Sequence, residues 1–117
     1  MPDERLPPQL QEQWQQLQNL NAQLQSVLQQ KAQFEAMKAE AAQALEALEA
    51  LPAEATVYRS VGALLVKEAA KKDAVARLRE EAETLDVRTS RLQKQEESMK
   101  VSLQALQKKI QAALPKA

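Results

Sequence analysis

The 117-residue chain contains neither cysteine nor histidine. Without cysteine there is no disulfide framework and no thiol chemistry. Without histidine the commonest general base is missing, and cysteine and histidine are also the usual transition-metal ligands. Glycine occurs once, so no glycine-rich loop can hold phosphate groups. These absences argue against an enzyme, and we expect no catalytic residue, no metal site and no cofactor.

Aromatic residues and net charge are also scarce. Aromatics make up 3% of the chain, and Trp14, Phe34 and Tyr58 are the whole supply. The apolar content of 44% is mostly alanine and leucine, which suits narrow seams between long helices better than a compact mixed core. Sixteen basic and sixteen acidic residues cancel, so no bulk field favours nucleic acid or an anionic membrane. We therefore expect neither as a partner.

Targeting and membrane signals are missing as well. The first residues, M-P-D-E-R-L-P-P, have neither the basic region nor the apolar run of a secretory signal. The longest apolar run, Val61 to Val66, is far too short to span a bilayer. We expect a soluble, cytoplasmic protein.

A long helix is predicted over about residues 9–51. Pro7 and Pro8 suit the entry to a helix, and Pro52 disfavours helical geometry in the residue before it. Between them, residues spaced alternately by three and four follow the a/d pattern of a coiled coil. They are Leu17, Leu20, Leu24, Val27, Lys31, Phe34, Lys38, Ala41, Leu45 and Leu48. Eleven glutamines between Gln9 and Gln33 leave a low-complexity polar tract as the alternative, but the leucine spacing favours the helix.

A second helix is predicted over about residues 72–114, where the same spacing continues until Pro115. Its seam positions are Val75, Leu78, Ala82, Leu85, Thr89, Leu92, Glu96, Met99, Leu103, Leu106, Ile110 and Ala113. Each helix would be roughly 60 Å long at 1.5 Å per residue. We therefore expect one mostly α-helical domain over residues 1–117, in which the two helices form a long antiparallel coiled coil with both termini at one end.

The segment between the helices, residues 56–67, has a β-type composition. Ser60-Val61-Gly62 is a plausible reversal between strands at 56–59 and 63–67, because glycine reaches positive φ at little cost. Leu64, Leu65 and Val66 are consecutive, so both faces of the second strand are apolar. A lone two-stranded hairpin is marginal in water and has two open edges. We expect hairpins from several chains to pair into a sheet or barrel; the alternative is a hairpin folded back on its own coiled coil.

The chain resembles the β-type subunit of prefoldin. The resemblance lies in the order helix, hairpin, helix and in the hairpin V-Y-R-S-V-G-A-L-L-V-K, residues 57–67. The run L-x-x-R-x-x-x-L-x-x-Q-E-E at residues 85–97 is also similar to the second helix of that family.

The resemblance implies an ATP-independent chaperone, a holdase that captures unfolded polypeptides and delivers them to a group II chaperonin. It also implies a cytosolic hetero-hexamer of two α-type and four β-type subunits, in which the hairpins form an inter-subunit β-barrel. The expected interface residues are Thr56, Val57, Tyr58, Arg59, Gly62, Leu64, Leu65 and Val66.

The free ends of the coiled coil are the expected binding site for unfolded proteins. A seam that frays at its ends exposes apolar groups, which bind unfolded chains without reading their sequence. The residues concerned are Leu6, Leu10, Trp14, Leu17, Leu106, Ile110 and Leu114. For Trp14 the alternative is that its ring fills the seam opposite Ile110. For the protein as a whole the alternative is a structural or adaptor coiled coil without chaperone activity.

Overall fold

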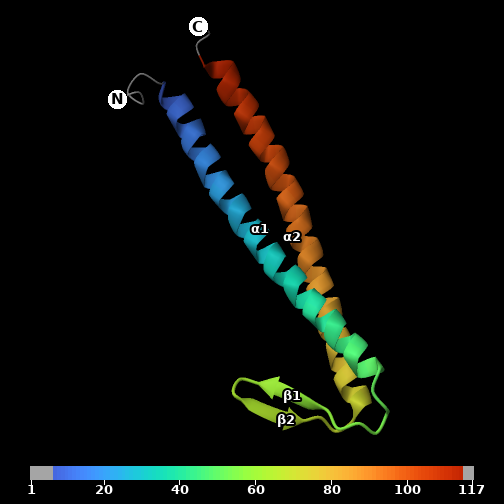
Figure 1. The fold of residues 1–117 in the computed structure, drawn as a ribbon. Coiled ribbons are helices and arrows are strands. Elements are labelled where there is room, and N and C mark those ends of the chain that lie inside the picture. The colour runs from blue at the N-terminus through green and yellow to red at the C-terminus, as the bar shows by residue number, and fades with distance from the viewer. Residues whose placement is uncertain (1–6, 115–117) are drawn as a thin grey trace. The chain divides into compact units, whose positions relative to one another are not determined.

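The protein, in a computed structural model that describes residues 7–114, consists of two long helices separated by a β-hairpin (Figure 1). The elements, in chain order, are α1 (Pro8–Glu49), β1 (Tyr58–Val61), β2 (Leu64–Lys67) and α2 (Lys71–Ala113). The expected fold class is therefore confirmed. The chain divides into two compact units, Met1–Lys31 with Arg91–Ala117 and Ala32–Ser90, and each unit contains part of both helices. That the whole chain acts as a single domain stays a prediction.

The prolines delimit α1 through their backbone chemistry. Pro7 lies just outside the helix, and its carbonyl accepts hydrogen bonds from the N–H groups of Leu10 and Gln11, at 3.0 and 3.1 Å. Pro8 can be the first helical residue because its missing N–H would have no intrahelical partner. At the other end the Leu51 N–H donates to Leu48 O at 3.0 Å, a tightened last turn before Pro52.

The start of α2 is set by Ala70 and Ala74. The Ala70 carbonyl accepts from the N–H groups of Asp73 and Ala74, which closes the first turn. Asp73 places a carboxylate in that turn, where the helix dipole favours negative charge. Ala74 is fully buried, although it does not belong to the expected seam, which begins at Val75.

In the first unit the two helix segments pack antiparallel around an apolar seam. Leu10 and Leu17 of α1 and Ile110 of α2 form a buried cluster, against which Leu103 and Leu106 pack. Burial of this kind contributes roughly 1.5–3 kcal/mol for each large apolar side chain. The seam is therefore closed as far as the first turn of α1.

In the second unit the helix segments are also antiparallel, as two ion pairs show. Lys38 Nζ lies 2.6 Å from Asp86 Oδ1, and farther along α1 Glu49 Oε1 lies 3.1 Å from Arg79. The Arg88 guanidinium lies 5.9 Å from the centre of the half-buried Phe34 ring, a cation–π contact.

The expected seam agrees with burial in both helices. Every position expected in the first helix is buried or half-buried, and in the second helix only Ala113 is exposed. The a/d spacing therefore identified the packed face of each helix. Within residues 7–114, no helix has the length and apolar character needed to cross a membrane.

The hairpin has a tighter turn than expected. Tyr58 pairs with Lys67 and Val61 with Leu64, so the reversal consists of Gly62 and Ala63 alone, not of Ser60-Val61-Gly62. Gly62 has a φ of 59°, and no other described residue has a positive φ. A glycine with positive φ at the first central position is typical of a type II′ turn, whose twist matches the twist of paired strands. The strands are therefore 58–61 and 64–67, not 56–59 and 63–67.

Candidate functional site

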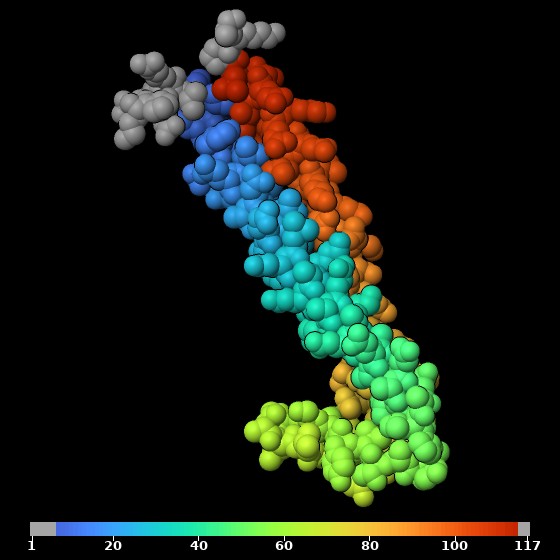
Figure 2. Space-filling model, in the orientation of Figure 1, coloured from blue at the N-terminus to red at the C-terminus, as the bar shows by residue number. Residues whose placement is uncertain are grey.

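The hairpin exposes apolar side chains on both of its faces. Because residues directly opposite each other share a face, Tyr58 and Leu65 lie on one side and Val61, Leu64 and Val66 on the other. These five residues are called the hairpin surface below. All eight strand residues are exposed, with Leu64 at 68% and Leu65 at 73%. The hairpin is therefore not folded back on the helices of its own unit, and the space-filling view shows it projecting from them (Figure 2).

The base of the hairpin is fixed to α2 by polar contacts. The Glu68 N–H donates to Val57 O at 2.8 Å and continues the strand pairing by one residue. The Glu68 carboxylate accepts from Arg77 Nε at 3.0 Å, and both side chains are largely buried. Lys71 Nζ donates to Leu51 O at 2.6 Å and so holds the loop after α1. These anchors orient a hairpin whose strand residues all remain exposed to solvent. Sequence reasoning missed them, since neither an i,i+9 ion pair nor a lysine capping carbonyls has a periodic signal.

Of the residues expected at the coiled-coil ends, the structure brings some together in the seam. Leu10, Leu17 and Ile110 are buried in one cluster, and Leu106 is half-buried beside them. Leu6 lies outside the described residues. In the folded seam these residues are covered, and their exposure through fraying stays a prediction.

Trp14 and Leu114 are the expected end residues that remain exposed, at 49% and 45%. Counting back from Leu17 by four and three gives Gln13 and Leu10 as seam positions, so Trp14 lies one residue beside the seam. Its ring therefore does not fill the seam opposite Ile110, and that alternative is wrong. The indole offers a large amphipathic surface to solvent.

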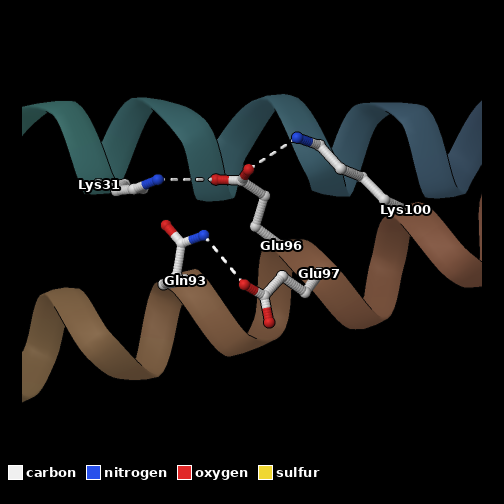
Figure 3. A network of polar contacts seen from close by, with 5 residues as sticks. All are labelled: Lys31, Gln93, Glu96, Glu97 and Lys100. Carbon is white, nitrogen blue, oxygen red and sulfur yellow. Dashed lines mark hydrogen bonds and ion pairs between the residues drawn. The ribbon is translucent and has the colours of Figure 1, made fainter.

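A polar layer interrupts the apolar seam of the first unit (Figure 3). The buried Glu96 carboxylate of α2 accepts from Lys31 of α1 at 3.1 Å and from Lys100 at 2.8 Å. Hydrogen bonds from Lys100 and then from Lys31 lower the pKa of Glu96, although desolvation opposes them. Glu96 is thus a paired structural carboxylate. Within residues 7–114 no cluster of three or more acidic, histidine or cysteine side chains could hold a metal ion.

Comparisons with known proteins agree with this architecture. The family model described as prefoldin subunit matches residues 11–117. The chain belongs to the prefoldin family. It is 45% identical over 111 residues to prefoldin subunit beta of Pyrococcus abyssi, covering 95% of this chain and 94% of the relative. With prefoldin subunit beta of Methanosarcina acetivorans it shares 45% identity over 113 residues, 96% of each chain.

A solved structure extends the likeness to three dimensions. The crystal structure of the prefoldin beta subunit from Thermococcus strain KS-1 matches with a TM-score of 0.85 and 42% sequence identity. The match covers 97% of this chain and 98% of the other. The resemblance drawn from the hairpin motif is therefore confirmed. The function is that of a prefoldin chaperone subunit, and the adaptor alternative is not favoured.

Proposed function

We propose that this chain works as an ATP-independent holdase in the cytoplasm, as part of a hetero-hexamer of two α-type and four β-type subunits. Unfolded polypeptides bind at the ends of its helices and pass to a group II chaperonin. Neither catalysis nor a cofactor takes part. The family supports assembly with other prefoldin subunits, while the stoichiometry, the α-type partner and the chaperonin are parts of the proposal.

The hairpin surface carries the assembly part of this proposal. Leu64, Leu65 and Val66 are exposed in the isolated chain, on a hairpin whose two edges are unpaired within the described residues. Pairing with hairpins of other subunits would satisfy the edge N–H and C=O groups and bury both faces in a β-barrel. Of the other expected interface residues, Tyr58 belongs to the hairpin surface, and Thr56, Val57, Arg59 and Gly62 lie next to it in the sequence.

Exposed apolar groups near the helix ends support the binding of unfolded chains. Trp14 and Leu114 offer such groups without disturbing the seam. Leu6, Leu10, Leu17, Leu106 and Ile110 would add to them when the ends of the helices separate. Local opening of this kind is easiest at chain ends, because few contacts must break there.

The two exposed groups can be removed without opening the seam. Deleting the ends instead would expose the next seam layer and so create new apolar surface. We expect Trp14→Ser with Leu114→Ser to weaken the suppression of aggregation of two unrelated unfolded proteins, with the oligomer intact. The matched control is Val87→Ser with Val101→Ser, which removes two exposed apolar side chains elsewhere on α2. Equal protection by both double variants would move the binding site away from the helix ends.

A further inference from the structure

The first unit contains a groove along the edge of the apolar seam, at some distance in the sequence from the hairpin. It has a volume of about 510 Å³ and lies between α1 and α2. Its lining includes the half-buried Leu20 and Leu106, and the exposed side-chain amides of Gln16, Asn19 and Gln23 line its α1 side. The Asn19 side-chain carbonyl already accepts a hydrogen bond from Gln15 Nε2 at 3.3 Å, so at this residue the N–H donors are the groups offered to a partner. Lys109 is the single charged residue of the lining. This set of residues is called the amide groove below.

The lining selects for a partner with its own unpaired donors and acceptors. A side-chain amide has two N–H donors and one carbonyl acceptor, and it loses hydrogen bonds to water when an apolar surface covers it. The apolar face of another helix is therefore a poor occupant. Nucleic acid requires several cations along its backbone, whereas the amide groove has one. An extended peptide carries an N–H and a C=O on nearly every residue, and both can pair with amides.

Charge adds a preference for acidic segments. The described part of the first unit has six basic residues and three acidic ones, a net charge of +3. The basic residues are Lys31, Arg91, Lys94, Lys100, Lys108 and Lys109, and the acidic ones are Glu12, Glu96 and Glu97. Glu96 already pairs with Lys31 and Lys100, whereas Lys109 has no ion-pair partner among residues 7–114. Lys109 is thus available to a carboxylate in the groove.

We propose that the amide groove binds an extended, acidic segment of an unfolded polypeptide through that segment's peptide groups. The inference rests on the proposed holdase function and adds a second mode of contact beside the exposed apolar groups at the helix ends. From Gln16 to Gln23 the helix rises about 10 Å, which matches about three residues of extended chain. A single groove therefore binds weakly, and several grooves in one assembly would act together.

The chain offers a matched control for the test. Gln16, Asn19 and Gln23 line the groove, whereas Gln18, Asn21 and Gln25 have the same residue types at the same spacing and lie exposed outside it. Replacing either triplet by alanine changes intrinsic helix propensity equally, and the groove triplet also removes the hydrogen bond from Gln15 Nε2 to Asn19 Oδ1, worth roughly 0.2–0.5 kcal/mol. In the same way, Lys109→Gln has Lys108→Gln as its neighbouring control.

The measurement is fluorescence anisotropy with the full-length chain and three labelled peptides of about ten residues, longer when extended than the groove. The first alternates leucine and serine around a central aspartate, the second replaces the aspartate by asparagine, and the third is N-methylated at alternate peptide groups.

We expect the groove triplet variant to bind the first peptide about tenfold more weakly, as the loss of a few hydrogen bonds implies, and the control triplet to bind as the parent does. Lys109→Gln should abolish the preference for aspartate, whereas Lys108→Gln should keep it. N-methylation should weaken binding to the parent and not to the groove variant.

The contrary outcomes separate the two proposals. Unchanged binding by the groove variant, or an equal loss in both triplet variants, overturns the amide groove and leaves the holdase function standing. A change in oligomeric state confined to the groove variant, seen by sedimentation, assigns the groove to another subunit and also overturns the inference. If the parent binds no peptide and protects no unfolded protein, the holdase proposal fails together with the groove.

Discussion

Charging the hairpin surface tests the assembly proposal most directly. Leu65 and Val66 are adjacent in β2 and therefore point to opposite faces of the hairpin. They are 73% and 45% exposed in the isolated chain, so most of the leucine surface and nearly half of the valine surface are available for burial against another chain. Replacing both by aspartate should leave the helices folded and prevent assembly.

The expected magnitude follows from the area that remains to be buried. Full burial of a leucine or valine contributes about 1.5–3 kcal/mol, so the exposed parts of Leu65 and Val66 would contribute together about 2–3 kcal/mol per copy. Burying unpaired carboxylates costs several kcal/mol more. A total near 5 kcal/mol weakens each contact by roughly a thousandfold or more, since 1.4 kcal/mol is a factor of ten.

Sedimentation velocity with the partner subunits measures the loss, and circular dichroism checks that the helices persist. Val87→Asp is the control, because it charges a similarly exposed apolar residue on α2 and away from the hairpin. The single variants Leu65→Asp and Val66→Asp show which face of the hairpin is buried. A double variant that sediments like the parent would refute the hairpin as the interface.

Three further changes probe the subunit itself. Ile110→Ala should lower the free energy of unfolding in urea by about 2–5 kcal/mol, because Ile110 is buried. Val101→Ala, at a 68% exposed site, should lower it by almost nothing. Equal losses in the two variants would contradict the closed seam. In Gly62→Ala the added Cβ would meet no atom within 4 Å, so the penalty comes from the positive φ alone and is about 1–2 kcal/mol. Assembly should therefore weaken, and it should weaken less with Gly62→Asn. An unaffected alanine variant would argue against the II′ turn. The pKa of Glu96 is lowered in the folded state, so the stabilisation from this carboxylate is present above about pH 4.3 and is lost as the pH falls through the folded-state pKa. The melting temperature of Glu96→Gln should therefore fall less on acidification than that of the parent. Parallel curves of melting temperature against pH would show that the pairing contributes nothing.

Periodicity predicted the helices and their packed faces because a coiled-coil seam is written in local spacing. Leu24 and Val27 in α1, and Leu85 and Leu92 in α2, are buried where the three-four count places them. The same count, carried back beyond Leu17, would have placed Trp14 outside the seam.

The turn and the start of α2 depend on backbone geometry that periodicity does not describe. Gly62 marked the reversal, but its place as the first central residue of a two-residue turn follows from the II′ geometry, which shifts the strand bounds. Ala74, in the first turn of α2, is fully buried although it is not an expected seam position. Nothing in the heptad count predicts that burial.

The heptad spacing alone treats the polar residues of the seam as interruptions, but the structure gives them a role. Lys31 and Glu96 are both seam positions, and the structure pairs them across the helices of the first unit. Slipping one helix by a heptad in one direction would set Lys31 beside Leu103; in the other direction it would set Glu96 beside Leu24. Either slip leaves a charge in an apolar layer, which costs more than a surface ion pair contributes. Leucine at both positions would pack in every register, whereas Lys31 and Glu96 face one another in a single register, as polar residues do in other coiled coils. The first slip would bring Lys38 to Glu96, but it would still leave Lys31 beside Leu103. The layer thus aligns α1 with α2 independently of the hairpin, and this alignment also places the amides of α1 across the groove from Lys109.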